Sequence, residues 1–250
     1  MKIGGFRKCS EVDFPGRTAA VVFLQGCNWR CPYCRTASLV VPQCFNDPIP
    51  EEEVLRYLRR NRSRIRSVVI TGGEPTIHAD LPEFLAKLRA LKLAIKLDTN
   101  GSQPDMLREV FRDRLVDYVA MDVKAPLRNY AQAVGKQVDV EAVRASIFLV
   151  KNAGVAHEFR TTVVPGLHTL NEIKELSNLV RGADYFVLQG YDSSHASRDD
   201  FRNRVGFTRK SLEGMRKHFT RKVKRFEVRG TEHAASEPEI EAADAHQIAV

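Results

Sequence analysis

Three cysteines, Cys27, Cys31 and Cys34, lie in one short segment near the start of the chain, at steps of four and then three residues. Thiolates bind soft metals and iron–sulfur clusters, and three of them on one loop can surround one metal centre. A four-iron cluster with only three cysteines keeps one iron open to a substrate, as catalytic metal sites do. The spacing therefore predicts such a cluster, with two alternatives: a zinc site that adds Cys44, or a cluster that only carries electrons.

The chain has five cysteines, and all of them fall within its first 44 residues. An odd number of thiols, in a chain that begins without a signal-peptide pattern, argues against a disulfide framework. Because no cysteine follows Cys44, we do not expect a second cluster held by cysteines of this chain. Cys9 and Cys44 are taken as ordinary thiols.

Polar and glycine-containing motifs follow the predicted strands downstream of the cysteines. These are Thr71-Gly72-Gly73-Glu74-Pro75, Asp98-Thr99-Asn100-Gly101, Asp122-Val123-Lys124, Arg160 within a strand and Gln189 at a strand end. Each alone is more often structural, but together they occupy the carboxyl ends of successive strands, where parallel barrels build their sites. Paired glycines let a backbone approach a ligand closely. The alternation of a strand places Asp122 and Lys124 on the same side.

The chemistry of these side chains suggests one class of ligand. Lys124 and Arg160 can each meet a carboxylate. Asp98 or Asn100 can hold ribose hydroxyls. This inventory fits an amino acid joined to a nucleoside.

The elements that must position these residues alternate between strand and helix. Strands are predicted at Thr18–Gln25, Ser67–Thr71, Ala94–Asp98, Asp117–Asp122, Glu158–Val164 and Tyr185–Gln189, with a short one near Lys224–Val228. Helical spacing of apolar residues marks Glu51–Leu58, Leu81–Leu91, Val140–Val150, Leu170–Val180 and Arg209–Phe219. Six βα units are fewer than the eight of a closed barrel. We therefore expect an α/β fold, a partial, laterally open (β/α)6 TIM-like barrel.

Composition and charge limit the remaining possibilities. The 250 residues are 43% hydrophobic, enough for a full core, and contain no apolar run of transmembrane length, so a cytoplasmic protein without a membrane partner is expected. The formal net charge is +8, with basic excess in residues 56–66 and 198–229. Without a nucleic-acid motif, these stretches are interpreted as solvated helix faces. We expect one domain over residues 1–230 and an acidic, disordered tail over 231–250.

In this order, the motifs resemble those of radical S-adenosylmethionine (SAM) enzymes. They are most similar to the activating proteins of anaerobic ribonucleoside-triphosphate reductases, in the glycyl-radical-enzyme activase group. The similarity covers roughly residues 1–230. The segments that carry it are Lys2–Phe6, Asp13–Gly16, Phe23–Asn28, the cysteine loop, Thr71–Pro75, Asp98–Gly101, Asp122–Lys124 and Val163–Gly166.

The resemblance implies an open barrel of the radical SAM type, a 4Fe-4S cluster on Cys27, Cys31 and Cys34, and bound SAM. By the same resemblance, the backbone of Tyr33–Arg35 should meet the adenine, with the Tyr33 side chain packed nearby. Gly72, Gly73 and Glu74 should contact the methionine amino group of SAM, and Asp98 and Asn100 should lie near its ribose. Asp122 and Lys124 should position the methionine end, with Lys124 on the carboxylate. Arg160 and Gln189 are further candidate contacts to SAM.

The activity implied is reductive cleavage of SAM to a 5′-deoxyadenosyl radical, which then generates a glycyl radical on an anaerobic ribonucleotide reductase. A flavodoxin or ferredoxin would supply the electron, and the chemistry would be anaerobic. The group usually continues Cys-His-Asn after its third cysteine, whereas this chain has Cys34-Arg35-Thr36, and the histidine of formate-lyase activases is absent from Leu188–Asp192. Two alternatives stay open: a radical enzyme for a small molecule, such as a nucleoside or deazapurine precursor, and a non-enzymatic iron–sulfur carrier or zinc module.

Overall fold

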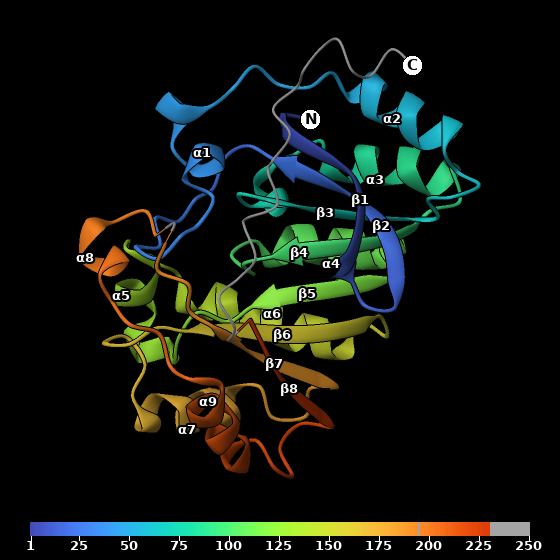
Figure 1. Cartoon of the computed structure of the whole chain (residues 1–250). Coiled ribbons are helices and arrows are strands. Elements are labelled where there is room, and N and C mark those ends of the chain that lie inside the picture. The colour runs from blue at the N-terminus through green and yellow to red at the C-terminus, as the bar shows by residue number, and fades with distance from the viewer. Residues whose placement is uncertain (195, 231–250) are drawn as a thin grey trace.

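The strands of the chain form one sheet in sequence order. The computed structural model describes residues 1–194 and 196–230, and its eight strands run from β1 (Ile3–Phe14) to β8 (Arg225–Arg229). β1 is antiparallel to β2 (Arg17–Leu24), and all later neighbours pair in parallel. Over these residues β1 and β8 do not pair, so the sheet is open, as Figure 1 shows.

The predicted strands are present with small shifts at their ends. They are β2, β3 (Ser67–Gly72), β4 (Ala94–Thr99), β5 (Tyr118–Asp122), β6 (Ala156–Val163) and β7 (Tyr185–Gly190). The open α/β fold is thereby confirmed. β8, the short strand expected near Lys224–Val228, pairs with β7 in parallel and lengthens the parallel part of the sheet. The antiparallel β1 was not predicted, because its glycine-rich and polar sequence lacks the apolar run of a buried strand.

Helices cover the outer face of the sheet. The larger ones are α2 (Glu51–Arg60), α3 (Leu81–Ala90), α4 (Pro104–Arg112), α6 (Val140–Asn152), α7 (Leu170–Leu179) and α9 (Arg209–Met215), and the short ones are α1 (Ala37–Val40), α5 (Tyr130–Val134) and α8 (Asp199–Arg202). All predicted helices are present. α4 was missed, although Pro104 at its first turn is a usual helix start, and it buries Leu107 and Val110.

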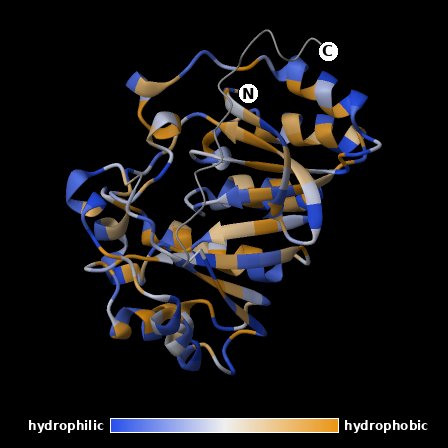
Figure 2. Ribbon diagram, in the orientation of Figure 1, coloured by the Kyte–Doolittle hydropathy of each residue, from blue (hydrophilic) through white to orange (hydrophobic). Residues whose placement is uncertain are grey.

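The two faces of the sheet differ in chemistry because successive side chains of a strand point to opposite sides. One set, including Val22, Leu97 and Val119, joins the main hydrophobic core with residues of the helices. Removal of this apolar surface from water is the main driving force of folding. Figure 2 shows hydrophobic residues along the strands and hydrophilic ones on the outer helix surfaces. The other set, on β4 and β6, includes Lys96 and Glu158, which are buried but charged.

The basic stretch over residues 56–66 is a solvated surface: all six of its arginines are exposed. Among the described residues no helix is long and apolar enough to cross a membrane. The acidic tail predicted for residues 231–250 lies outside the described residues.

Candidate functional site

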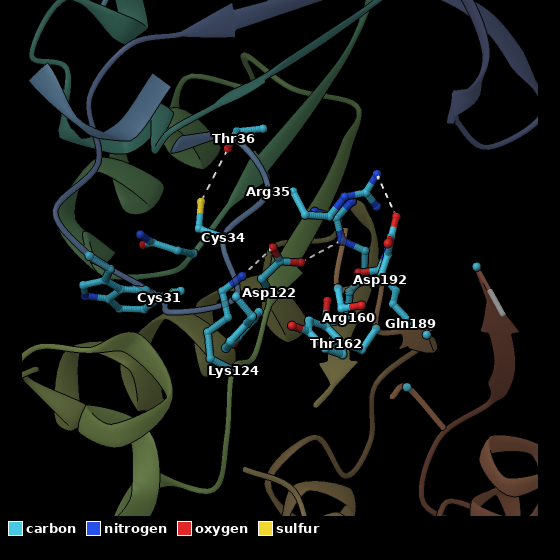
Figure 3. A pocket seen from close by; sticks show the side chains of 18 of the residues that line it. Cys31, Cys34, Arg35, Thr36, Asp122, Lys124, Arg160, Thr162, Gln189 and Asp192 are labelled. Atoms are coloured by element: carbon cyan, nitrogen blue, oxygen red, sulfur yellow. Dashed lines mark hydrogen bonds and ion pairs between the residues drawn. The ribbon is translucent and has the colours of Figure 1, made fainter. Parts of the chain in front are cut away.

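A pocket of about 760 Å³ is lined by residues from the carboxyl ends of the parallel strands and from the cysteine loop. Figure 3 shows side chains of the cysteine loop opposite those of β5 and β6 across this space. The structure brings together every residue predicted to hold the cluster or SAM. They are Cys27, Cys31, Tyr33, Cys34, Arg35, Gly72, Gly73, Glu74, Asp98, Asn100, Asp122, Lys124, Arg160 and Gln189.

The three thiols of the cysteine loop are unpaired and partly buried. The Trp29 N–H donates to Cys27 Sγ at 3.4 Å, and the Thr36 hydroxyl lies 3.6 Å from Cys34 Sγ. Burial raises the pKa of Cys27 to about 11 and that of Cys31 to about 12. These two thiols are therefore protonated at neutral pH, and metal binding must displace their protons.

The arrangement of donors fits an iron–sulfur cluster better than a single ion. Cys27, Cys31 and Cys34 line one pocket and lie close enough to influence one another's ionisation. Yet in the part of the chain that the structure describes, no three His, Cys, Asp or Glu side chains converge on one metal ion. Cys44, the fourth ligand of the zinc alternative, is exposed and lies outside the lining of the pocket. Three thiols spread around a wider space suit a group larger than zinc.

The double variant Cys9→Ser/Cys44→Ser should retain iron binding and SAM cleavage within about twofold of the wild type, because both thiols are exposed and outside the pocket. Iron and sulfide per chain after anaerobic reconstitution, together with 5′-deoxyadenosine formed, provide the measurement. Loss of iron from the Cys44→Ser single variant would instead show that Cys44 is a ligand, as the alternative with four cysteine ligands requires.

The paired glycines hold the start of the cysteine loop. The Gly73 N–H donates to the Leu24 carbonyl at 2.9 Å, and the Glu74 N–H donates to the Gly26 carbonyl at 2.8 Å. A Cβ on Gly73 would lie 2.0 Å from the Gly26 oxygen, and one on Gly72, whose φ is +122°, would lie 2.2 Å from the Leu24 nitrogen. Only glycine allows this close approach, which fixes the backbone immediately before Cys27.

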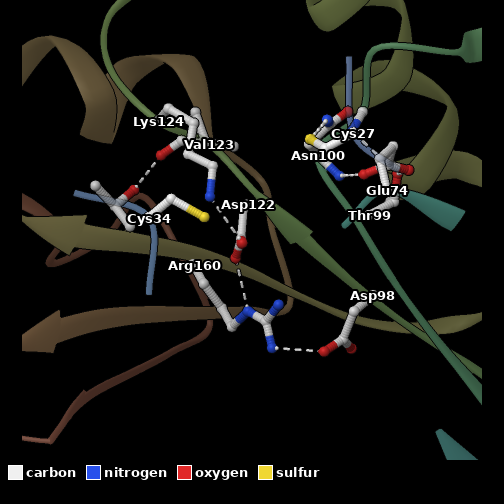
Figure 4. Close-up of polar contacts among 12 residues, drawn as sticks. Cys27, Cys34, Glu74, Asp98, Thr99, Asn100, Asp122, Val123, Lys124 and Arg160 are labelled. Carbon is white, nitrogen blue, oxygen red and sulfur yellow. Dashed lines mark hydrogen bonds and ion pairs between the residues drawn. The ribbon is translucent and has the colours of Figure 1, made fainter. Parts of the chain in front are cut away.

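The Glu74 carboxylate is buried and joins the ends of two strands. It accepts hydrogen bonds from the Thr76 N–H (3.0 Å) and hydroxyl (2.5 Å), the Thr99 hydroxyl (2.7 Å) and the Asn100 N–H (2.6 Å). The Asn100 amide in turn donates to Asn28 Oδ1 at 3.0 Å and lies 4.0 Å from Cys27 Sγ. Figure 4 shows this group beside Cys27. In the protein alone, Glu74 and Asn100 thus connect β3 and β4 to the cysteine loop.

A chain of largely half-buried ion pairs forms the opposite side of the pocket, and Figure 4 draws it from Lys124 to Asp98. Lys124 Nζ lies 2.9 Å from Asp122, whose other oxygen accepts from Arg160 Nε at 2.8 Å. Arg160 also contacts Asp98 at 3.3 Å, and Lys96 Nζ lies 2.5 Å from Asp98. Burial raises the pKa of Asp122, but the two cations outweigh it and hold that pKa well below its usual value. Burial alone would lower the pKa of Lys124, but the negative charge of Asp122 outweighs burial and raises that pKa well above its ordinary value.

The contacts of the two pocket cations differ. The guanidinium of Arg160 is shared between Asp122 and Asp98, with Glu158 at 3.9 Å. Lys124 Nζ has Asp122 as its hydrogen-bond partner within the described residues. A lysine ammonium has three N–H donors, so Lys124 keeps two for a ligand. Of the two, Lys124 is therefore the better placed to bind a carboxylate.

Arg160→Met should destabilise the fold by about 1.5–3 kcal/mol, the value of a hydrogen bond to a charged group, because Asp122 and Asp98 lose their shared cation but keep Lys124 and Lys96. Asp98 and Asp122 would then face each other across adjacent strands without the shared cation. Urea unfolding gives the measurement. The control, Arg59→Met, breaks an exposed ion pair with Glu52 and should leave the midpoint nearly unchanged. Equal stability of both variants would show that the Arg160 contacts contribute little.

Two residues that the sequence reasoning missed hold the backbone of Lys124. Its N–H donates to the Tyr130 hydroxyl at 3.1 Å, and its carbonyl lies 2.8 Å from His168 Nε2. The Val164 N–H donates to His168 Nδ1 at 2.9 Å, so the proton of this imidazole is on Nε2, which donates to Lys124. The segment Val163–Gly166, which carries part of the family resemblance, ends two residues before His168, and it was the only nearby feature of the sequence that could have drawn attention to this histidine.

The segment after β7 supports the cysteine loop from outside, which no sequence motif indicated. The Ser197 hydroxyl donates to the carbonyls of Cys31 and Pro32, both at 3.1 Å, and the Arg198 N–H donates to that of Pro32 at 3.2 Å.

The Tyr33 hydroxyl is buried and has no hydrogen-bond partner among the described residues. An unpaired buried hydroxyl in the lining of a pocket is satisfied when a ligand supplies a partner.

Comparison with known proteins adds independent findings. A sequence profile described as "Radical SAM superfamily" matches residues 21–180. The chain is 30% identical over 213 residues to a protein of Methanocaldococcus jannaschii named "putative glycyl-radical enzyme activating enzyme", covering 80% of this chain and 84% of that protein. It is 31% identical over 178 residues to the 7-carboxy-7-deazaguanine synthase of Archaeoglobus fulgidus, covering 66% of this chain and 71% of that one.

Among solved structures, SuiB of Streptococcus suis bound to the precursor peptide SuiA has the same fold, with a TM-score of 0.67 at 16% identity. The superposition covers 84% of this chain and 48% of SuiB, so the chain spans about half the length of that neighbour.

Proposed function

The chain belongs to the radical SAM superfamily, whose enzymes use a 4Fe-4S cluster and SAM, and we propose that it activates a glycyl-radical enzyme. The first candidate for its target is an anaerobic ribonucleotide reductase. When bound, the cluster and SAM supply a 5′-deoxyadenosyl radical, which takes a hydrogen atom from the substrate. The residues of this chain bind and orient that cofactor pair.

We assign the cluster to Cys27, Cys31 and Cys34, and the carboxylate of SAM to Lys124. The Tyr33 hydroxyl, which is buried without a protein partner among the described residues, is a further candidate contact. The other residues predicted to contact SAM line the same pocket, and we propose that they surround the bound SAM.

The observation that carries the choice of a protein substrate is the relative from Methanocaldococcus jannaschii. Its similarity extends over 80% of this chain and 84% of its own length, which is most of the fold that surrounds the site. The lining of the pocket also includes a rim over residues 203–208, of which Asn203, Val205 and Thr208 are exposed and the others half-buried. A site with an exposed rim is accessible to a segment of another protein.

The test is anaerobic reconstitution with iron and sulfide, followed by dithionite and SAM. The expected product is 5′-deoxyadenosine, and addition of the anaerobic reductase of the same genome should give a glycyl-radical doublet by electron paramagnetic resonance. A reductase whose radical glycine is replaced by alanine serves as the control. SAM cleavage without a doublet, in the presence of a competent reductase, would reject the activase function while leaving the radical SAM assignment intact.

A second candidate is a radical enzyme for a small molecule, favoured by the similarity to 7-carboxy-7-deazaguanine synthase. Under this alternative, a deazapurine precursor should accelerate SAM cleavage and be consumed with it, whereas the reductase should have no effect. Membership in an enzyme superfamily disfavours the third possibility, a module that only carries electrons or binds zinc.

We also propose a flavodoxin or ferredoxin as electron donor. Exposed cations flank the cysteine loop: Arg30 within it, Lys136 beyond the end of α5, and Arg198 on the segment that binds Pro32. Acidic electron carriers are attracted to such a surface. Reduced flavodoxin should therefore replace dithionite in the cleavage assay.

A further inference from the structure

We propose that residues 203–208, the rim segment, are the docking edge for an extended stretch of the protein substrate, which pairs with this segment through its backbone. The inference rests on the proposed function, because it supposes that the hydrogen atom comes from a protein. It goes further by naming the surface that receives the polypeptide and the kind of contact that holds it.

The rim segment forms part of the pocket wall next to the carboxyl end of β7. Each of its residues, from Asn203 to Thr208, lines the pocket, as do Gln189 and Tyr191 at the carboxyl end of β7. A Cβ on Gly206 would lie 2.6 Å from the Tyr191 carbonyl oxygen, so the backbone here is pressed against that strand end. Figure 1 shows this part of the chain running from α8 to α9 without forming a helix or strand. A polypeptide bound along it would pass over the pocket.

Both ends of the rim segment are fixed. The Arg204 guanidinium donates to the Pro165 carbonyl at 2.7 Å and lies 3.6 Å from the centre of the Phe201 ring. At the other end, Thr208 caps the start of α9, and its hydroxyl accepts from the Ser211 N–H at 3.2 Å. A segment anchored in this way loses little conformational entropy when a partner binds, which favours affinity.

Between these anchors the backbone lacks partners. Within the part of the chain described by the structure, the N–H and C=O groups of Val205, Gly206 and Phe207 form no hydrogen bond. Val205 is 88% exposed, an unusual position for a branched apolar side chain. Consecutive free backbone groups beside an exposed apolar residue are the features that strand addition uses: main-chain hydrogen bonds give affinity, and alternate side chains give specificity.

The alternative occupant, a small polar ligand, would need convergent polar side chains on this side of the pocket. The cations on this side of the pocket are already engaged within the protein: Arg202 with the Ala196 carbonyl and Asp199, Arg204 with the Pro165 carbonyl, and Arg229 with Glu158 and Glu227. A six-residue segment can span up to about 20 Å, which suits a polypeptide better than a small molecule. A glycine in that polypeptide, with no side chain, can bring its Cα closest to the pocket.

The experiment compares Val205→Asp and Val205→Ser with Val12→Asp. Val12 is the matched control, an 85% exposed valine in the β1 strand that does not line the pocket. Full-length reconstituted protein is titrated with the anaerobic reductase, and the rate of glycyl-radical formation is divided by the variant's own rate of uncoupled SAM cleavage. Binding is measured separately, by anisotropy of a labelled synthetic peptide centred on the radical glycine of the reductase.

The expected result is a half-saturating reductase concentration raised by about tenfold or more in Val205→Asp, less in Val205→Ser, with peptide affinity falling in parallel. Val12→Asp should match the wild type. Unchanged saturation and peptide binding in both Val205 variants, while the wild type forms the glycyl radical, would overturn the docking edge and leave the activase function standing. A wild type that forms no glycyl radical would reject the activase function itself. A change only in self-association, seen by sedimentation, would assign the rim to a second copy of this chain and also overturn the proposal.

Discussion

Cys31→Ala is expected to abolish SAM cleavage, with 5′-deoxyadenosine falling below detection and bound iron falling with it. Cys31 is the middle one of the three proposed cluster ligands, and burial raises the pKa of its thiol to about 12. Such a thiol gives up its proton only to a strongly binding metal centre. With Cys27 and Cys34 alone, two of the three proposed ligands would remain, too few to hold a 4Fe-4S cluster that keeps one iron open to SAM.

The measurement is the iron and sulfide content of the reconstituted variant, together with its product yield. Cys9→Ala is the matched control, since Cys9 is exposed and outside the pocket lining. Circular dichroism and the unfolding midpoint of the unreconstituted proteins show whether the fold is retained. Cleavage activity in a folded Cys31→Ala variant would overturn the ligand assignment, and with it the placement of the cluster in this loop.

Much of the site could be predicted because its residues sit at strand ends. Apolar runs such as Ser67–Gly72 identify parallel strands, and strands that pair in order carry their carboxyl ends to one edge. Glu74 and Lys124, which lie fifty residues apart, therefore line the same pocket without any need for knowledge of individual contacts. The roles of these residues towards SAM stay predictions until a ligand is bound.

The contacts between these residues could not be predicted, since they depend on which strands become neighbours and which rotamers then fit. Nothing local to Glu74 indicates that Thr99 and Asn100 will donate to it. Arg160 was considered for a substrate carboxylate, but its guanidinium is shared among carboxylates of the protein. The spacing of apolar residues also fails to predict β1, because this polar segment becomes a strand through its pairing with β2 and not through its own sequence pattern.

Lys124→Ala is expected to weaken SAM binding by about ten- to a hundredfold, the loss of a charge-assisted hydrogen bond worth about 1.5–3 kcal/mol. The ammonium is held at the pocket wall by Asp122, while Tyr130 and His168 fix its backbone, so the position of the charge is set before a ligand arrives. Asp122 would keep Arg160 as a partner in the variant, and the fold should therefore persist.

The dissociation constant of SAM, measured by equilibrium dialysis with the anaerobically reconstituted protein, separates this role from a purely structural one. Lys136→Ala removes an exposed lysine outside the pocket lining and controls for the change in net charge. Weaker binding in Lys124→Ala with an unchanged cluster content would place the ammonium on the ligand. An unchanged dissociation constant would make Lys124 a partner of Asp122 alone, and the carboxylate of SAM would then need another cation. Because Arg160 is already shared among protein carboxylates, such a result would also require that network to rearrange when SAM binds.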